Sequence, residues 1–181
     1  MTTELKALPM AEALEFWLSK VKLSPREFYA LAEQYRVLAF TVSRLARADM
    51  LAEIFEALYR AIQDGTSFEA WSKDLEPIWV ENGWVGLQAW RIDTIFRTNI
   101  QTAYNVGRYK QMMLVSDARP FWQYSAVNDS RTRPTHRALH GRVYRFDSPF
   151  WDTWYPPNGH RCRCKVKTLS DRQVRGRGLD V

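Results

Sequence analysis

The sequence of 181 residues is poor in the residues from which disulfide frameworks and metal centres are built. It contains two cysteines and three histidines, and a single residue separates the two cysteines. Such a pair does not make the disulfide framework of a small secreted domain. The chain also lacks any apolar run of about 18 residues, and no signal peptide opens it. We therefore expect a soluble protein made in the cytoplasm, with no membrane partner.

Acidic residues are scarce in the C-terminal part of the chain. From Arg131 to Arg177 there are 12 Lys and Arg residues but only 3 Asp and Glu residues, a balance of +9. The whole chain carries +6, so the remainder sums to −3. Such charge suits DNA phosphates, an acidic protein surface or a face in contact with solvent, and charge alone does not choose among them. The candidates for contact with nucleic acid are four basic residues around the cysteines: Arg161, Arg163, Lys165 and Lys167.

Proline is absent from residues 88–115, where apolar residues recur with the period of a helix. This segment predicts one helix of about 40 Å, since each residue adds about 1.5 Å. Gly107 lies inside it and costs about 1 kcal/mol relative to alanine, which indicates close packing against another backbone. Earlier in the chain, capping signals at Ser24, Asp49 and Thr66 and a glycine stop at Gly65 predict further helices.

Residues 117–170 predict a compact domain that contains a small antiparallel sheet. The segments FWQYSAV from Phe121, VYRF from Val143 and CRCKVKTL from Cys162 alternate in polarity, as short strands do. Pro134 and Gly141 fit the first turn and the C-terminal stop of a short helix between the first two strands.

We thus predict an α+β protein in three parts. Residues 1–116 form a helical region that includes the long helix, and residues 117–170 form the compact domain with a cluster of histidines and cysteines. Residues 171–181 are expected to be a basic, glycine-containing tail with no core of its own.

The two cysteines lie two positions apart on the third predicted strand. Alternation puts both on one face and the neighbouring basic side chains on the other. Their Cα atoms would be about 6.6 Å apart, at the far edge of the disulfide range, so a bridge between them would be strained. Zinc takes thiolate and imidazole ligands in a tetrahedron and can be reached from one face without that strain. The candidate zinc ligands are His136, His160, Cys162 and Cys164.

An alternative without any cofactor stays open for the same residues. The pattern H-x-C-x-C is rarer among zinc sites than C-x-x-C. Free cysteine is among the most buried residue types, so the two cysteines could instead be small core residues while the histidines cap turns.

Catalysis is the next function to weigh, because Asp, Arg and His occur close together. Asp129 and His136 could act as a general acid–base pair with Arg131 holding a phosphate, as in a nuclease. Against this, the sequence has no carboxylate pair for two metals, no phosphate-cradling glycine loop and no nucleophile signature. We expect no enzyme, and we interpret the D-S-R-T run as turn chemistry in which Arg131 bonds a carboxylate or carbonyls of the domain.

Several ordered motifs together carry a family resemblance. They are R-T-N-x-x-x-A-Y-x-x-G-R within residues 95–112, D-S-R-T-x-x-x-H at 129–136, Gly141, P-F-W at 149–151, P-P-N-G-H at 156–160 and C-R-C at 162–164. The opening pattern F-x-x-x-K-V-x-L-S-x-x-E-F at residues 16–28 adds to them. In this order the motifs resemble the phage Mu protein F-like family, and the likeness covers nearly all of the chain.

The resemblance implies a minor head, or head morphogenesis, protein of a tailed bacteriophage or prophage. Its partners would be the portal protein and the capsid and scaffold proteins, with phage DNA as a further contact. Its location would be the procapsid interior and virion, after assembly in the bacterial host cytoplasm. The alternative is a DNA-binding or nuclease-like domain that uses the basic C-terminal segment with Asp129 and His136. The motif residues expected to shape the compact domain are Asp129, Arg131, Thr132, Gly141, Trp151, Pro156, Pro157 and Asn158.

Overall fold

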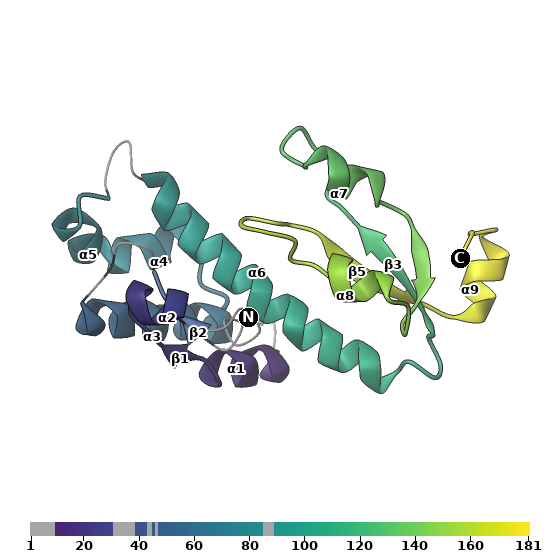
Figure 1. Cartoon of the computed structure of the whole chain (residues 1–181), viewed down its shortest axis with the longest axis horizontal. Coiled ribbons are helices and arrows are strands. Elements are labelled where there is room, and N and C mark those ends of the chain that lie inside the picture. The colour runs from purple at the N-terminus through teal and green to yellow at the C-terminus, as the bar shows by residue number, and fades with distance from the viewer. Residues whose placement is uncertain (1–9, 31–38, 43–44, 46, 85–88) are drawn as a thin grey trace, which may run out of the picture. The chain divides into compact units, whose positions relative to one another are not determined.

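The computed structural model describes residues 10–30, 39–42, 45, 47–84 and 89–181. The chain divides into two compact units between Gly107 and Arg108. The first unit is mainly helical and the second contains a three-stranded antiparallel sheet, which confirms the predicted α+β class. In chain order (Figure 1) the elements are α1 (Ala11–Leu18), β1 (Val21–Lys22), α2 (Pro25–Ala30), β2 (Ala39–Phe40), α3 (Ala48–Asp64), α4 (Phe68–Asp74), α5 (Glu76–Glu81), α6 (Ala89–Leu114), β3 (Phe121–Ser125), α7 (Pro134–Ala138), β4 (Val143–Arg145), α8 (Phe150–Trp154), β5 (Lys165–Leu169) and α9 (Asp171–Gly176).

The predicted long helix is α6, which runs for 26 residues. Phe96 and Ala103 belong to the core of the first unit, whereas Met112 belongs to the core of the second. The Tyr109 ring also packs in the second unit, with its centroid 5.6 Å from that of Trp122. The division between the units therefore falls inside α6, whereas the sequence places it after the helix. None of the described helices, α6 included, has the length and apolar character needed to span a membrane.

Capping chemistry sets several helix ends of the first unit, as predicted. The Ser24 N–H donates to Glu27 Oε2 at 2.8 Å, and the Glu27 N–H donates to Ser24 Oγ at 3.3 Å, which is a capping box before α2. Gly65 ends α3 with a left-handed φ of 67°, a conformation that costs glycine little. Ser67 begins α4, where its Oγ accepts the Ala70 N–H at 3.3 Å.

Two expected caps and one strand pair in this unit differ from the prediction. Asp49 does not cap α3, because the helix already begins at Ala48 and the aspartate binds Arg47 instead. The cap of α4 is Ser67 and not Thr66. The parallel pairing of β1 with β2 was not predicted, since strands of two residues are too short to show alternation.

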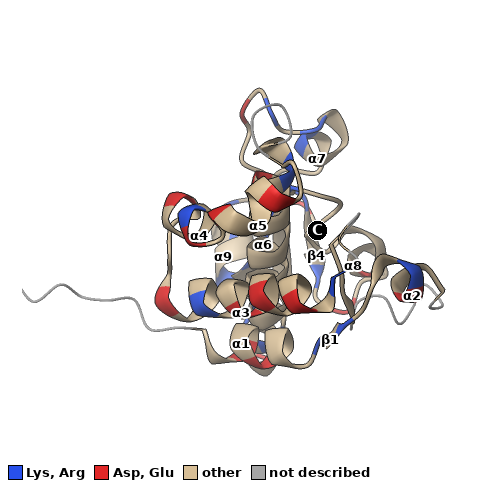
Figure 2. Cartoon of the chain, turned by 90° about the vertical axis from the view of Figure 1, so that its left-hand side faces the viewer, with Lys and Arg blue, Asp and Glu red and all other residues tan. Residues whose placement is uncertain are grey.

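The core of the first unit forms around α3 and a group of aromatic rings. Trp17 stacks on Phe55 with centroids 4.9 Å apart and meets Phe40 edge-on at 5.3 Å. Its indole N–H is also satisfied, because it donates to the Phe55 carbonyl at 3.2 Å. The opposite face of α3 is charged and mostly acidic (Figure 2). Its exposed charged residues are Asp49, Glu53, Glu56, Arg60 and Asp64.

The second unit is organised around β3, the middle strand of the order β4-β3-β5. Both pairings are antiparallel, and Trp122 of β3 lies opposite Tyr144 of β4 and Thr168 of β5. Trp122 is completely buried, and its ring meets that of Trp151 on α8 at 5.6 Å. Aromatic side chains bury large apolar areas, so packing of this kind contributes strongly to the core of so small a unit.

The third predicted strand is shorter than the sequence indicates. β5 begins at Lys165, so Cys162 and Cys164 lie in the loop before it. The alternation itself persists, because both cysteines and Val166 are buried while Lys165 is exposed. Burial on one side therefore continues from the strand into the loop.

The expected tail after residue 170 is instead part of the second unit. Ser170 and Gln173 form a capping box that starts α9. Val174 on this helix is buried against Val143 and Leu169 of the sheet. A short apolar contact and one cap order the segment here, because one face of the sheet offers a surface for Val174.

Gly107 confirms the predicted close approach of two backbones. A Cβ atom built at this position would lie 2.9 Å from the Ala13 nitrogen and 2.5 Å from Met10 Sδ. Contacts this short require movement of α1 or of the helix itself. The glycine therefore allows α6 to pack directly on α1 inside the first unit.

We predict that Gly107→Ala destabilises the protein even though alanine is the better helix former. Overpacking costs about 1–3 kcal/mol, against a gain of about 1 kcal/mol in helix propensity. The free energy of unfolding, measured in urea, should fall, whereas the control Gly176→Ala in α9 should leave it unchanged or slightly higher, since no atom lies within 4 Å of that site. A Gly107→Ala protein as stable as wild type would contradict the close approach.

Candidate metal centre

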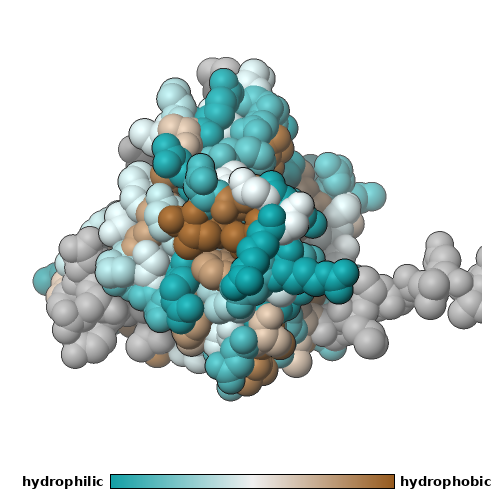
Figure 3. Space-filling model, turned by 90° about the vertical axis from the view of Figure 1, so that its right-hand side faces the viewer, coloured by the Kyte–Doolittle hydropathy of each residue, from teal (hydrophilic) through white to brown (hydrophobic). Residues whose placement is uncertain are grey.

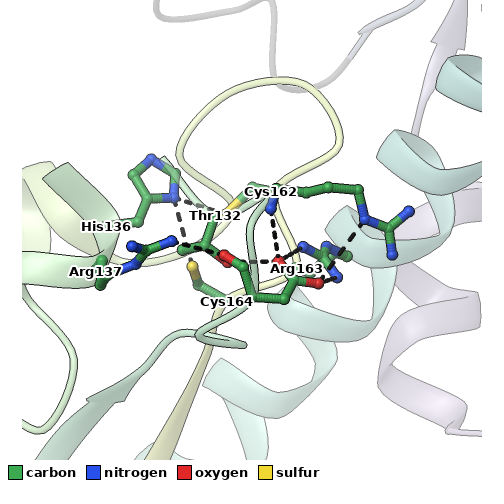
Figure 4. A network of polar contacts seen from close by, with 8 residues as sticks. Thr132, His136, Arg137, Cys162, Arg163 and Cys164 are labelled. Atoms are coloured by element: carbon green, nitrogen blue, oxygen red, sulfur yellow. Dashed lines mark hydrogen bonds and ion pairs between the residues drawn. The ribbon is translucent and has the colours of Figure 1, made fainter. Parts of the chain in front are cut away.

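Three of the four predicted zinc ligands come together in the second unit. His136 lies on α7, and Cys162 and Cys164 lie in the loop that leads into β5. The His136 Nδ1 atom is 3.4 Å from Cys164 Sγ and 3.7 Å from Cys162 Sγ. In Figure 4 the imidazole faces both sulfur atoms. The three side chains are only 4%, 3% and 2% exposed, so this is a buried cluster.

His160 does not join the cluster. Its residue is exposed, and its carbonyl accepts a hydrogen bond from Arg133 Nη2 at 2.8 Å. The reason is a turn around it, in which the flanking residues Gly159 and Arg161 have φ values of 93° and 57°. A continuous strand would have carried His160 on the same face as Cys162, but these left-handed residues break that register.

The short helix α7 holds His136 in position. Pro134 lies in its first turn, as predicted, and Arg137 Nη2 donates to the Asp129 carbonyl at 2.7 Å. After the helix, Gly141 has the expected positive φ of 87°, and its N–H donates to the Tyr124 carbonyl at 2.9 Å. The helix is thus tied to β3 on one side and to the D-S-R-T turn on the other.

The cysteines of the C-R-C motif are buried, whereas the arginine between them forms an ion pair. Arg163 donates to Asp129 through both of its terminal nitrogens, at 2.7 and 2.6 Å. The same carboxylate accepts the Thr132 hydroxyl at 3.1 Å and the Arg131 N–H at 3.1 Å. Bidentate arginine–carboxylate pairs are the strongest of the side-chain ion pairs.

This arrangement bears on two sequence expectations. Arg131 was expected to bond a carboxylate or carbonyls of the domain, and it does form an ion pair with Asp129, but a long one, with Nε 3.8 Å from Oδ2 and a side chain that is 74% exposed. Arg163 was a candidate for nucleic acid, yet it is only 29% exposed and binds Asp129. Both side chains lie near the same carboxylate, but Arg163 binds it more closely because it donates two parallel hydrogen bonds.

The remaining basic candidates lie on the outside of the unit. Lys165 and Lys167 are exposed on β5, opposite Ser125 and Gln123 of β3. Arg161 is exposed as well, in the turn before the cysteines. Of the four predicted nucleic-acid residues, three are therefore exposed, whereas Arg163 is partly buried against Asp129.

The two members of the nuclease-like pair each have other partners. The Asp129 oxygens accept hydrogen bonds from Arg163 and Thr132, and the His136 Nδ1 atom faces the two thiols. Asp129 also stays ionised, since the hydrogen bonds from Arg163 lower its pKa well below the usual range.

The two thiols form a hydrogen-bonded pair in which the pKa values shift in opposite directions. The hydrogen bond with Cys164 lowers the pKa of Cys162, because a donor to sulfur favours the thiolate. The same hydrogen bond, together with burial, raises the pKa of Cys164. Burial also raises the pKa of Tyr124, whose phenol is hydrogen bonded to Cys164.

The other motif residues support the loop that carries the cysteines. Asn158 donates to the Trp154 carbonyl at 2.9 Å and to the Tyr124 hydroxyl at 3.2 Å. The buried Pro156 precedes Pro157 across a cis peptide bond. Trp151 is buried on α8.

Sequence reasoning missed Tyr124, Arg133 and Arg108. Tyr124 joins Asn158 to the cysteines, Arg133 holds the His160 carbonyl, and Arg108 Nη2 donates to the Val166 carbonyl at 3.0 Å. For Arg108 a signal was present, because it ends the R-T-N-x-x-x-A-Y-x-x-G-R motif. The other two carry no pattern that distinguishes them from ordinary strand and turn residues.

A family model described as "Phage Mu protein F like protein" matches residues 52–167. The chain belongs to this family. The match includes α6, the Asp129–Arg163 pair and the whole cluster of His136, Cys162 and Cys164, whereas α9 lies outside it.

Individual relatives agree with this Mu F-like assignment. The chain is 43% identical over 166 residues to the "Mu-like prophage FluMu F protein" of Haemophilus influenzae, which covers 85% of the chain and 40% of that protein. It is 38% identical over an alignment of 190 residues to the "Putative capsid assembly protein F" of Escherichia phage Mu, covering 96% and 43%. An uncharacterized protein of Methanocaldococcus jannaschii is 27% identical over 124 residues, covering 66% and 17%. The chain thus spans less than half the length of these relatives, and no solved structure matches it.

We predict that Asp129→Asn destabilises this Mu F-like protein at neutral pH, because Arg163 loses its partner. Asp129 has a lowered pKa when folded, so its stabilising effect is present above the unfolded pKa of about 4 and fades as the pH falls toward the folded value. Urea unfolding should show a difference between wild type and variant at pH 7 that narrows below about pH 4.

The matched control for this change is Asp147→Asn, which removes a carboxylate from an exposed pair with Arg145. Exposed pairs of this kind add little stability, so the control should stay close to wild type. An equal effect of the two substitutions would contradict a structural role for the Asp129–Arg163 pair.

Proposed function

We propose that this chain is a head-assembly protein of a Mu-like phage or prophage, placed in the procapsid interior and virion and acting in head morphogenesis. The observation that supports this most is its 38% identity to a putative capsid assembly protein over 96% of the chain. That similarity includes both compact units. Because the chain covers 43% of that relative, the proposal concerns the part that the two share.

The action we propose is contact with other head proteins, without catalysis. Asp129 and His136, which could have formed an acid–base pair, are held by Arg163 and by the thiols. Groups that are already satisfied in this way are poor proton acceptors. The chain is then a binding component whose polar motif shapes its own fold.

The partners we propose are the portal protein and the inner capsid or scaffold proteins. Exposed apolar side chains support a protein partner, since Leu114 at the end of α6 is 82% exposed and Trp90 near its start is 56% exposed. On the face drawn in Figure 3, hydrophobic residues gather in one area that is ringed by hydrophilic ones. An apolar centre with a polar rim is the usual composition of a protein interface.

We predict that the chain co-purifies with the portal protein of the same phage and that raising the salt concentration changes this binding little. Leu114→Asp should weaken it about tenfold or more, since burying a leucine is worth about 1.5–3 kcal/mol. The melting temperature of the variant should be unchanged because the side chain is exposed. Portal binding that is absent in wild type, or equal in the variant, would count against a contact at Leu114.

Packaged DNA is a further contact that we propose, on the support of Lys165 and Lys167, which are exposed on β5. Contacts with phosphate release counterions, so affinity for duplex DNA should fall steeply with salt. Lys165→Gln/Lys167→Gln should reduce the slope of log K against log salt by about two, while Lys73→Gln in the first unit should not. An unchanged slope in the double variant would show that these lysines do not touch DNA.

A further inference from the structure

We propose that His136, Cys162 and Cys164 bind a zinc ion through Nδ1 and the two Sγ atoms. This goes beyond the assembly role and does not depend on it. The three ligand atoms all lie within 4.8 Å of one another, and all three side chains are buried.

The distances from His136 Nδ1 to the two sulfurs fit a zinc tetrahedron. Zn–S bonds of about 2.3 Å and Zn–N bonds of about 2.0–2.1 Å at tetrahedral angles place nitrogen and sulfur about 3.6 Å apart. The His136 Nδ1 atom lies 3.4 and 3.7 Å from the two sulfurs, within about 0.2 Å of that value. Both edges from the imidazole therefore have the length that one shared ion requires.

The surroundings of the sulfurs suit thiolate ligands. Cys162 Sγ accepts hydrogen bonds from the backbone of Cys164 and Asn158, and the Tyr124 hydroxyl is hydrogen bonded to Cys164. Partners of this kind orient the ligands of a metal and hold its charge. Two thiolates and a neutral imidazole around Zn²⁺ carry no net charge, which reduces the cost of burial.

The Asp129–Arg163 ion pair holds the segment that carries the two cysteine ligands. Arg163 lies between the two cysteines in sequence, and its guanidinium is held by both Asp129 oxygens. Because successive side chains of an extended segment point to opposite sides, fixing Arg163 directs both sulfurs toward His136. The C-R-C motif thus has one residue for the ion pair and two for the metal.

The donor set also indicates which metal would bind. Thiolate and imidazole ligands select zinc over magnesium or calcium, which prefer oxygen. A bridge between the cysteines is disfavoured, since their spacing would strain it and neither is disulfide-bonded here. Three protein ligands leave the fourth tetrahedral position to a water molecule, because His160 is exposed and turned away by the residues around Gly159.

The test is the zinc content of the full chain, produced with zinc in the medium and purified without chelators. Elemental analysis should find about one zinc per wild-type chain, and chelation should lower the melting temperature. Cys162→Ser/Cys164→Ser should lose the metal. The control His160→Asn should keep it, which separates this three-ligand site from the four-ligand site that the sequence alone indicates.

Two measurements keep the proposal falsifiable if the double variant does not fold. Wild-type protein reconstituted with Co²⁺ should show thiolate-to-cobalt absorption in the near ultraviolet, and His136→Asn should reduce it. No bound zinc after equilibration with equimolar Zn²⁺ would overturn the site and leave a packed thiol–imidazole cluster. Loss of zinc in His160→Asn would overturn the ligand set. Neither result bears on binding to the portal protein.

Discussion

The hydrogen-bonded ion pair of Asp129 and Arg163 is the constraint on which the C-terminal unit depends. It joins the turn after β3 to the loop before β5, two segments that are 34 positions apart in the chain. With Arg163 held on one side, the flanking cysteines have only the other side left, where α7 presents His136. A single polar contact thus sets the direction of three consecutive side chains, and the D-S-R-T and C-R-C motifs are two halves of one structure.

Local features of the fold were predictable from the sequence because their causes are local. The capping box of Ser24 and Glu27 and the stop at Gly65 each depend on a few neighbouring residues. The partner of Asp129 was not predictable in the same way. Arg131 is near in sequence and Arg163 is distant, and only the folded chain shows that the distant one can align two nitrogens with the carboxylate.

The candidate site shows the same limit of sequence patterns. Alternation correctly placed Cys162 and Cys164 together, and the prediction of His136 nearby agrees with the structure. It placed His160 with them as well, because alternation assumes an unbroken strand. The left-handed Arg161 interrupts that strand, and non-glycine residues in this conformation are too rare to expect from sequence. α9 was missed for another reason, since one buried valine gives no periodicity to detect.

The position of the unit boundary within α6 affects how the protein is made. Helices shorter than about 12 residues are marginal alone, and only the last turns of α6 belong to the second unit. During synthesis the N-terminal unit emerges and folds first. Tyr109 and Met112, which pack in the core of the second unit, therefore lie on a helix that has already formed in the first unit. The last turns of α6 are thus already helical when the C-terminal unit folds. If residues 108–181 were expressed alone, these turns would have to become helical without the rest of α6.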